Sequence, residues 1–169
     1  MSLRVINNFN ECLETVNKTH FYIQDGDDQK PAFIVENNGE FEVTNNTSSP
    51  INFLKTDACV SSSNDNKRCD CAIYNDDTFC FIELKSSKRT NWKSHRETAE
   101  KQLKATILDF KNEDIAKNKT LEAYMCCTSC DIDGNRTRIL RASNSSDVQI
   151  YFKDILKTRL YCGTKKEFN

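Results

Sequence analysis

The sequence lacks the long apolar segments that a membrane protein needs. A transmembrane helix takes about 18–20 consecutive apolar residues, and no such run occurs in the chain. The mean hydropathy of -0.69 is correspondingly low, so we expect no membrane partner. The N-terminal MSLRVINNFNECLETV also lacks the apolar core of a signal peptide. We therefore expect a cytoplasmic protein.

The chain has little net charge, because 24 Lys and Arg stand against 25 Asp and Glu. Overall charge therefore gives no sign of nucleic-acid binding. The distribution is uneven: residues 85–104 hold seven Lys/Arg and two Asp/Glu, whereas residues 1–50 hold three and eight. A local basic segment can attract a phosphate backbone, and the alternative is a solvated helix face.

Cysteine is abundant, with nine residues. The odd number, the missing export signal and positions inside apolar runs argue against a secreted disulfide scaffold. The run Cys126-Cys127-Thr-Ser-Cys130 contains a CxxC, which could hold a structural Zn²⁺ together with Cys69 and Cys71, a pair that we expect on one face of a strand. The alternative is that these small apolar side chains fill the core.

Neither an internal repeat nor a second domain is visible, so residues 1–169 are expected to form one domain. Apolar periodicity predicts helices at 7–18, 94–111 and 147–159. Apolar runs between turn residues predict strands at 20–24, 32–36, 40–44, 52–60, 68–74, 78–84 and 121–127. This order of elements favours an α/β sandwich around one mixed sheet.

One segment, from Arg68 to Lys85, carries a constellation of charged residues. Its second strand, 78–84, is apolar on both faces until Glu83, as in a central strand, and a carboxylate there needs a partner. Residues two apart share a strand face, so Glu83 and Lys85 point the same way. Asp70 lies on the neighbouring strand of the expected hairpin, where its carboxylate can meet Glu83.

Two carboxylates and a lysine at one strand end suit phosphodiester hydrolysis. Asp70, Glu83 and the carbonyl of Leu84 could hold Mg²⁺ or Mn²⁺, which favour oxygen ligands. Such an ion lowers the pKa of an attacking water and stabilises charge on the phosphate. Lys85 could orient that water or neutralise the developing negative charge.

The pattern Asp-x12-Glu-x-Lys closing a hairpin resembles the PD-(D/E)xK nuclease superfamily, over about residues 52–110. The resemblance implies a restriction-endonuclease-like three-layer sandwich, with a central mixed β-sheet flanked by helices. It also implies a Mg²⁺-dependent endonuclease that cuts DNA in restriction, repair or phage defence, often as a homodimer. Asp70 and Glu83 would be metal ligands and Lys85 the catalytic lysine.

Two further positions follow from the resemblance. Family members often carry a glutamate on the first helix, which Glu14 or Glu11 could supply, with Glu14 favoured slightly. They also often carry a glutamine on the helix after the motif, a position that Gln102 fits. The chain departs from the family in having Cys69 instead of Pro, and in having Thr106 where the RecB-like branch has Tyr.

The basic segment would hold the nucleic-acid backbone through six side chains: Lys88, Arg89, Lys93, Arg96, Lys101 and Lys104. Two other functions stay open. The same fold can persist as a catalytically inactive binding module for DNA or protein, and the cysteines could make a zinc-stabilised interaction domain. Asp57, near the hairpin, could be a further metal ligand, although a turn role is the more ordinary interpretation.

Overall fold

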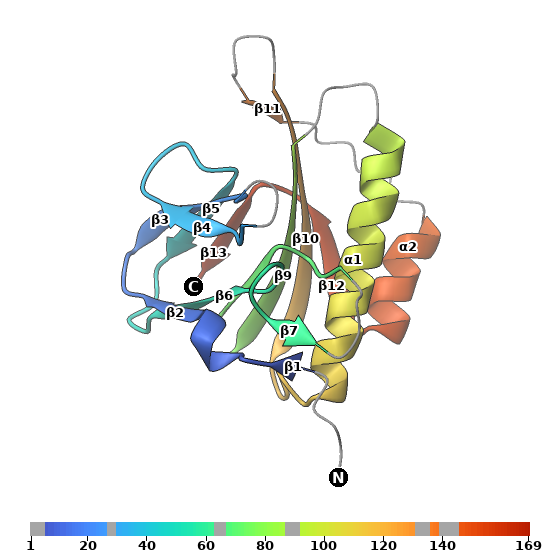
Figure 1. The fold of residues 1–169 in the computed structure, drawn as a ribbon, viewed down its shortest axis with the longest axis horizontal. Helices are drawn as coiled ribbons and strands as arrows, with labels where there is room; N and C mark the ends of the chain where they lie inside the picture. Colours follow the sequence, from blue (N-terminus) through green and yellow to red (C-terminus); the bar gives the residue numbers. More distant parts are fainter. Residues whose placement is uncertain (1–5, 27–29, 63–66, 87–91, 131–135, 139–145) are drawn as a thin grey trace.

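The computed structural model describes residues 6–26, 30–62, 67–86, 92–130, 136–138 and 146–169. Its centre is a mixed sheet with helices over one face and a second, smaller sheet over the other (Figure 1). The expected α/β class and mixed sheet are confirmed. In the described part of the chain, strands rather than a helix cover the second face.

The central sheet is antiparallel on one side and parallel on the other. Its antiparallel strands are β2 (Leu13–Val16), β6 (Ile51–Lys55), β8 (Cys71–Tyr74) and β9 (Thr78–Ser86), which pair in that order. Strand β10 (Thr120–Cys130) lies parallel to β9. Its far side pairs with the parallel β12 (Thr158–Cys162) and the antiparallel β11 (Arg136–Arg138). β9 is therefore an internal strand, as its apolar sequence predicted.

The second sheet has the order β13-β5-β3-β4, with bounds Lys165–Phe168, Phe41–Asn45, His20–Gln24 and Phe33–Val35. Short strands β1 (Ile6–Asn7) and β7 (Ser61–Ser62) pair separately. The buried residues between the two sheets form one cluster, here called the sheet-side core: among them Phe21, Ile23, Phe41, Val43, Phe53, Cys71, Ile73, Ile82 and Leu84.

Helix α1 (Trp92–Asn112) covers the other face of the central sheet, together with α2 (Ser146–Ile150) and the π-helical η3 (Tyr151–Ile155). The predicted stripe of α1 is confirmed, because Ala99, Leu103, Ile107 and Phe110 are fully buried. They belong to a second cluster, here called the helix-side core, with Leu54, Cys69, Ala72, Phe79, Phe81 and Phe152. Burying each such phenylalanine contributes roughly 2–3 kcal/mol, so this cluster fixes α1 on the sheet.

The predicted helix over residues 7–18 is wrong. The chain there forms a 3₁₀-helix, η1 (Asn10–Cys12), followed directly by β2. Pairing decides the outcome, since β2 adds to the edge of the central sheet beside β6 and buries Val16 in the sheet-side core. Cys12 is also joined to Cys59 in a disulfide bond, which the sequence did not indicate.

Three boundaries differ from the predictions. Strand 52–60 ends at Lys55, because residues 56–59 form a turn, and strand 68–74 begins only at Cys71. The final helix ends at Ile155, and two strands that were not predicted, β12 and β13, follow it. The predicted turn at 131–135 lies outside the described residues. Among the described helices, none has the length and apolar character to cross a membrane.

Candidate active site

The structure brings Asp70, Glu83 and Lys85 together at the open end of the β8–β9 hairpin. Cys71 pairs with Ile82, so Asp70 comes directly before the paired residues, level with Glu83. Asp70 is 8% exposed and Glu83 is fully buried. Lys85 Nζ lies 2.8 Å from Glu83 Oε1, and the main-chain N–H of Leu84 donates to Asp70 Oδ2 at 2.6 Å.

The alternation of β9 explains why two charged side chains lie inside the molecule. Phe79 and Phe81 pack in the helix-side core, whereas Ile82 and Leu84 pack in the sheet-side core. Glu83 continues the row of the two phenylalanines, beyond the point where the apolar packing ends. Its carboxylate is therefore placed under α1 at the rim of the core.

The Glu83 carboxylate is only partly compensated. Oε1 forms an ion pair with Lys85, but Oε2 is buried and has no hydrogen-bond partner among the described residues. A buried charged oxygen without a partner destabilises the folded state, because it loses its hydrogen bonds to water and gains none from the protein. The arrangement therefore favours either a proton or a cation at this oxygen.

The pKa values of the three groups point the same way. Burial raises the pKa of Asp70 to about 7, against the hydrogen bond from Leu84. Burial and then the charge of Asp70 raise the pKa of Glu83 well above its usual value. Burial lowers the pKa of Lys85, but the Glu83 carboxylate outweighs it and holds the pKa above its usual value. The two acids are thus poised to exchange protons for a cation, while Lys85 stays charged.

Two polar side chains of helix α1 form hydrogen bonds with the segment just before Asp70. Gln102 Nε2 donates to the carbonyl of Arg68 at 3.2 Å, and the N–H of Cys69 donates to Thr106 Oγ1 at 2.8 Å. The side chains of Gln102 and Thr106 are both buried, and within the described part of the chain Gln102 Oε1 has no hydrogen-bond partner. Gln102 and Thr106 therefore act on the site by positioning the segment that carries Asp70.

The turn after β6 holds the same segment from the other side. The N–H groups of Thr56 and Asp57 donate to the carbonyl of Asp70 at 3.2 and 3.3 Å, and Thr56 Oγ1 donates to the carbonyl of Cys69. Asp57 is thus a turn residue, as the sequence suggested. Its charge also contributes to the raised pKa of Asp70.

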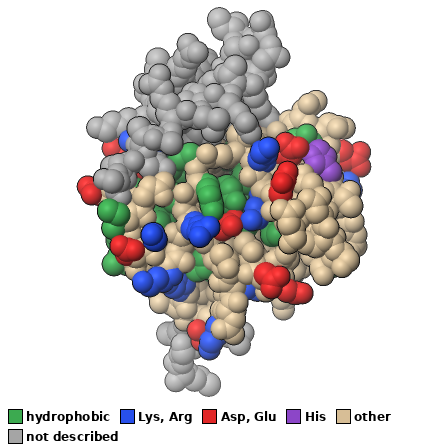
Figure 2. All heavy atoms as spheres, turned by 180° about the vertical axis from the view of Figure 1, so that it is seen from behind, with side chains coloured by type: hydrophobic (Ala, Val, Ile, Leu, Met, Phe, Trp, Pro, Cys, Tyr) green, Lys and Arg blue, Asp and Glu red, His purple; other side chains and the backbone are tan. Residues whose placement is uncertain are grey.

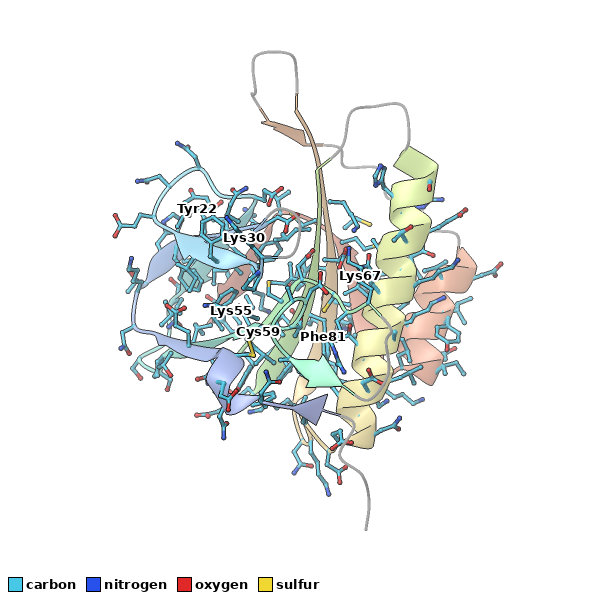
Figure 3. All side chains as sticks on the ribbon, viewed as in Figure 1. Tyr22, Lys30, Lys55, Cys59, Lys67 and Phe81 are labelled. Atoms are coloured by element: carbon cyan, nitrogen blue, oxygen red, sulfur yellow. A yellow bond between two sulfur atoms is a disulfide. The ribbon has the colours of Figure 1, made fainter. Side chains whose placement is uncertain are left out.

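Two charged residues near the site were missed in the sequence. Asp25, directly after β3 in the second sheet, adds to the raised pKa of Asp70. Lys67 is exposed, and its charge acts on Glu83 in the opposite sense, lowering the pKa (Figure 3). The only signals were the acidic run that starts at Asp25 and the basic pair that precedes Cys69.

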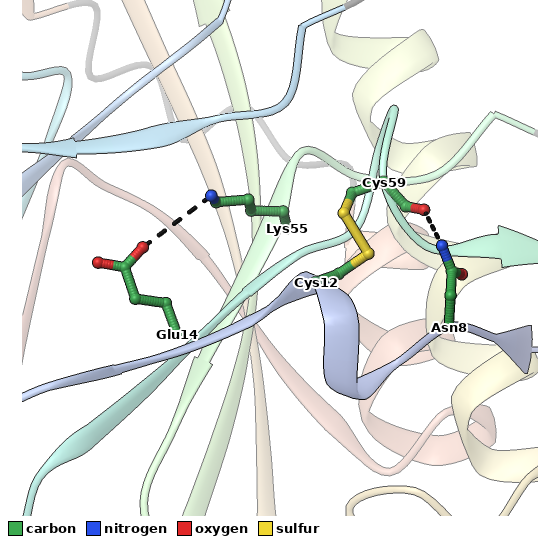
Figure 4. The surroundings of a disulfide bond; sticks show 5 residues. All are labelled: Asn8, Cys12, Glu14, Lys55 and Cys59. Carbon is green, nitrogen blue, oxygen red and sulfur yellow. Dashed lines mark hydrogen bonds and ion pairs between the residues drawn. A yellow bond between two sulfur atoms is a disulfide. The ribbon is translucent and has the colours of Figure 1, made fainter.

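The structure does not bring Glu14 to the other acids. It lies on the edge strand β2 instead of a helix, three strands away from Glu83, which is roughly 14 Å across a sheet. Its carboxylate lies 4.0 Å from Lys55 Nζ (Figure 4). Glu11, the other candidate, lies in η1.

The predicted backbone-binding residues are only partly described. Lys88 and Arg89 lie outside the described residues, as does the side chain of Lys93. Arg96 lies 3.9 Å from Glu100, and Lys104 Nζ stands 4.4 Å over the ring of Tyr151. Lys101 is exposed. On the face shown in Figure 2, Lys and Arg side chains are interspersed with Asp and Glu, so the charge there is mixed.

The proposed zinc pair is wrong in its geometry. Cys69 packs in the helix-side core and Cys71 in the sheet-side core, so the two do not share a face. Cys69 precedes β8, where the alternation of a strand does not apply. Burial raises the pKa of the Cys69 thiol to about 12, which keeps it protonated. Among the described residues, no group of three or more His, Cys, Asp or Glu side chains lies close enough together to hold a metal ion.

Comparison with known proteins finds no match among protein-family models, curated proteins or solved structures. Function is therefore inferred from the residues of the site and their geometry.

Without a divalent ion, stability is expected to fall as the pH rises from about 4 to about 7. Asp70 has an ordinary pKa of 3.8 and a folded pKa of about 7. Because the pKa of Asp70 is higher in the folded than in the unfolded protein, its contribution to stability is fully present below pH 3.8, the ordinary pKa. This contribution is lost as the pH rises through the pKa of the folded protein, about 7. The loss is about 4 kcal/mol in urea unfolding, and Asp70→Asn removes it. An identical pH profile in wild type and variant would contradict this account.

Thr106→Val is expected to destabilise the protein by about 1–3 kcal/mol, because the buried N–H of Cys69 loses its acceptor while the side-chain shape is kept. Thr106→Ser should restore most of the loss. Thr98→Val is the matched control: Thr98 bonds the carbonyl of Ser94 at 3.0 Å but is exposed. Chemical denaturation measures all three, and equal losses for Thr98→Val and Thr106→Val would remove the positioning role.

Proposed function

We propose that the protein is a Mg²⁺- or Mn²⁺-dependent endonuclease of the restriction-endonuclease-like fold, which hydrolyses phosphodiester bonds of DNA. One observation carries the proposal: the fully buried Glu83 carboxylate stands beside Asp70 and Lys85, and no residue that the structure describes forms a hydrogen bond with its Oε2. A purely structural ion pair would leave no reason for a second carboxylate at the same place.

The order of elements supports the same proposal. The β8–β9 hairpin carries the motif, α1 follows it, and β10 returns parallel to β9. Gln102 lies on α1, the helix after the motif, where the resemblance to the PD-(D/E)xK superfamily implies a glutamine, and its buried side chain contacts the segment before Asp70.

The residues present fit a divalent cation, because such an ion would satisfy Glu83 Oε2 and relieve the raised pKa values of both acids. Asp70, Glu83 and the carbonyl of Leu84 would hold it. When bound, the ion would lower the pKa of an attacking water and offset negative charge on the phosphate.

The chain's own residues supply position and charge. Lys85 keeps its proton near neutral pH, so it acts as a fixed positive charge toward the phosphate rather than as a base. The exposed Lys67 and Lys101 would contact neighbouring phosphates. Gln102 and Thr106 keep Asp70 in place. Only the resemblance supports two further parts of the proposal: that the protein acts as a homodimer that cuts both strands, and that it acts in restriction, repair or phage defence.

Cleavage of supercoiled plasmid and single-stranded DNA with Mg²⁺, Mn²⁺ or EDTA tests the proposal. We expect metal-dependent cutting by wild type and none by Asp70→Asn. Asp76→Asn is the control, because Asp76 is an exposed residue at the closed end of the same hairpin. Absence of cutting with either metal, or equal cutting by Asp70→Asn, would favour the catalytically inactive binding module.

A further inference from the structure

We propose that the Cys12–Cys59 disulfide is a redox control on the acidic centre: reduction loosens the turn that holds Asp70. The site it regulates is that of the proposed nuclease, so the inference rests on the proposed function. The bond joins the end of η1 to the turn at residues 56–59 (Figure 4).

The turn that the disulfide tethers is in direct contact with the main chain of Asp70. Thr56 and Asp57 donate their N–H groups to the Asp70 carbonyl, and the Thr56 hydroxyl donates to the carbonyl of Cys69. Cys59 follows Thr56 by three residues in the same turn. A movement of Cys59 therefore reaches Asp70 through one short stretch of main chain.

Asp70 depends on this turn because β8 begins only at Cys71. Its carbonyl is satisfied by the turn, while its carboxylate is held by the N–H of Leu84. If the turn shifts, the main chain that aims the carboxylate shifts with it. Of the two acids, Glu83 lies within β9, whereas Asp70 lies outside a regular strand.

The backbone of this turn is strained at one residue. Ala58 has a φ of 57°, in the left-handed region that residues with a Cβ rarely adopt. Next to Ala58, the disulfide at Cys59 and the hydrogen bond from Asn8 Nδ2 to the carbonyl of Cys59 at 2.8 Å hold the turn in this conformation. Removing the covalent contact lets the turn relax toward more favourable backbone angles.

The redox step is an exchange with a dithiol. A thiolate of the dithiol attacks the sulfur of Cys59, because Cys59 is only half-buried whereas Cys12 is buried, and Cys12 leaves as a thiolate that takes up a proton. The second thiol of the dithiol then displaces Cys59, leaving two protein thiols and one oxidised dithiol. Two electrons pass to the protein, and an oxidised dithiol reverses the step.

The test compares wild type before and after treatment with dithiothreitol, at a temperature where both forms are folded. Hydrogen exchange of the amides at 56–60 and 67–70 is expected to speed up by about tenfold or more on reduction, while those of β5 stay unchanged. Mn²⁺ affinity and DNA cleavage should fall together. Cys12→Ala with Cys59→Ala should match the reduced form and show no response to dithiothreitol, whereas Cys162→Ser, which changes a cysteine outside the disulfide, should respond like wild type.

The outcomes separate the two proposals. Faster exchange at 56–60 and 67–70 without Mn²⁺ binding or cleavage in either form would support the coupling of disulfide and turn and overturn the nuclease. Equal cleavage and equal exchange in both forms would overturn the redox control and leave the nuclease standing. An equal rise in exchange along the whole chain would also overturn it, because the bond would then only stabilise the fold.

Discussion

Lys85→Met is expected to reduce metal-dependent DNA cleavage by about 10²–10³-fold, the usual effect of removing one group that stabilises developing charge. Methionine keeps the apolar stem of the partly buried side chain and removes only the ammonium group. In the wild type the charge of Lys85 lowers the pKa of Glu83, so its loss should raise that pKa further. Initial rates on supercoiled plasmid at saturating Mg²⁺ measure the effect.

Lys119→Met is the matched control for this experiment. Lys119 Nζ bonds the carbonyls of Asn75 and Asp76 at 2.8 and 2.7 Å, so it supports the same hairpin at its closed end. Its loss should lower stability slightly and leave the cleavage rate per folded molecule unchanged. A Lys85→Met enzyme as active as Lys119→Met would show that the lysine only neutralises Glu83.

Glu83→Gln is expected to stabilise the metal-free protein at pH 8 by about 1–3 kcal/mol, while lowering Mn²⁺ affinity at least about 100-fold. Burial and the charge of Asp70 disfavour the charged form of Glu83 more strongly than Lys85 favours it, so a neutral side chain of the same size is better tolerated. Saturating Mn²⁺ should reverse the order of stability, since only wild type gains the binding free energy, about 2.7 kcal/mol at 100 times the Kd. Thermal unfolding in EDTA and in Mn²⁺ measures both effects.

Glu122→Gln provides the comparison, because Glu122 is a buried carboxylate of the opposite character. Burial raises its pKa, but Lys166 Nζ at 2.9 Å and the hydroxyl of Tyr124 at 2.7 Å outweigh this effect, and the net pKa is lowered. Its replacement should destabilise the protein with and without Mn²⁺ and leave Mn²⁺ affinity intact. Similar behaviour of the two variants would mean that Glu83 is a structural residue.

The hairpin that carries the candidate site could be predicted from the sequence because its signal is local. Alternation along 78–84 placed Phe79 and Phe81 on one face and put Glu83 in line with them, and the structure agrees. The spacing of the hairpin also brought Asp70 level with Glu83. The stripe of α1, from Ala99 to Phe110, was equally local.

The N-terminal segment was mispredicted because its structure depends on distant residues. Phe9, Leu13 and Val16 match a helical period over one short stretch, yet Leu13–Val16 pairs with Ile51–Lys55, far along the chain. The disulfide between Cys12 and Cys59 is equally non-local. Neither a strand partner nor a disulfide partner can be read from local periodicity, so Glu14 was assigned to the wrong kind of element.

The surroundings of the site were missed for the same physical reason. Asp25 belongs to the second sheet, and only the packing of two sheets brings its charge near Asp70. A continuous strand over 68–74 would place Cys69 and Cys71 on one face. In the structure, the hydrogen bonds that Cys69 accepts from Thr56 and donates to Thr106 hold it outside the strand, and these bonds also join distant parts of the chain.

The most direct test of the central claim is the anomalous scattering of Mn²⁺ in crystals soaked with the ion. A metal-dependent nuclease centre predicts a peak between Asp70 and Glu83, in contact with a carboxylate oxygen of each, and no peak at that place in Glu83→Gln crystals. A map in which the two carboxylates stay as they are, Lys85 remains on Glu83 and Mn²⁺ binds only elsewhere would contradict it.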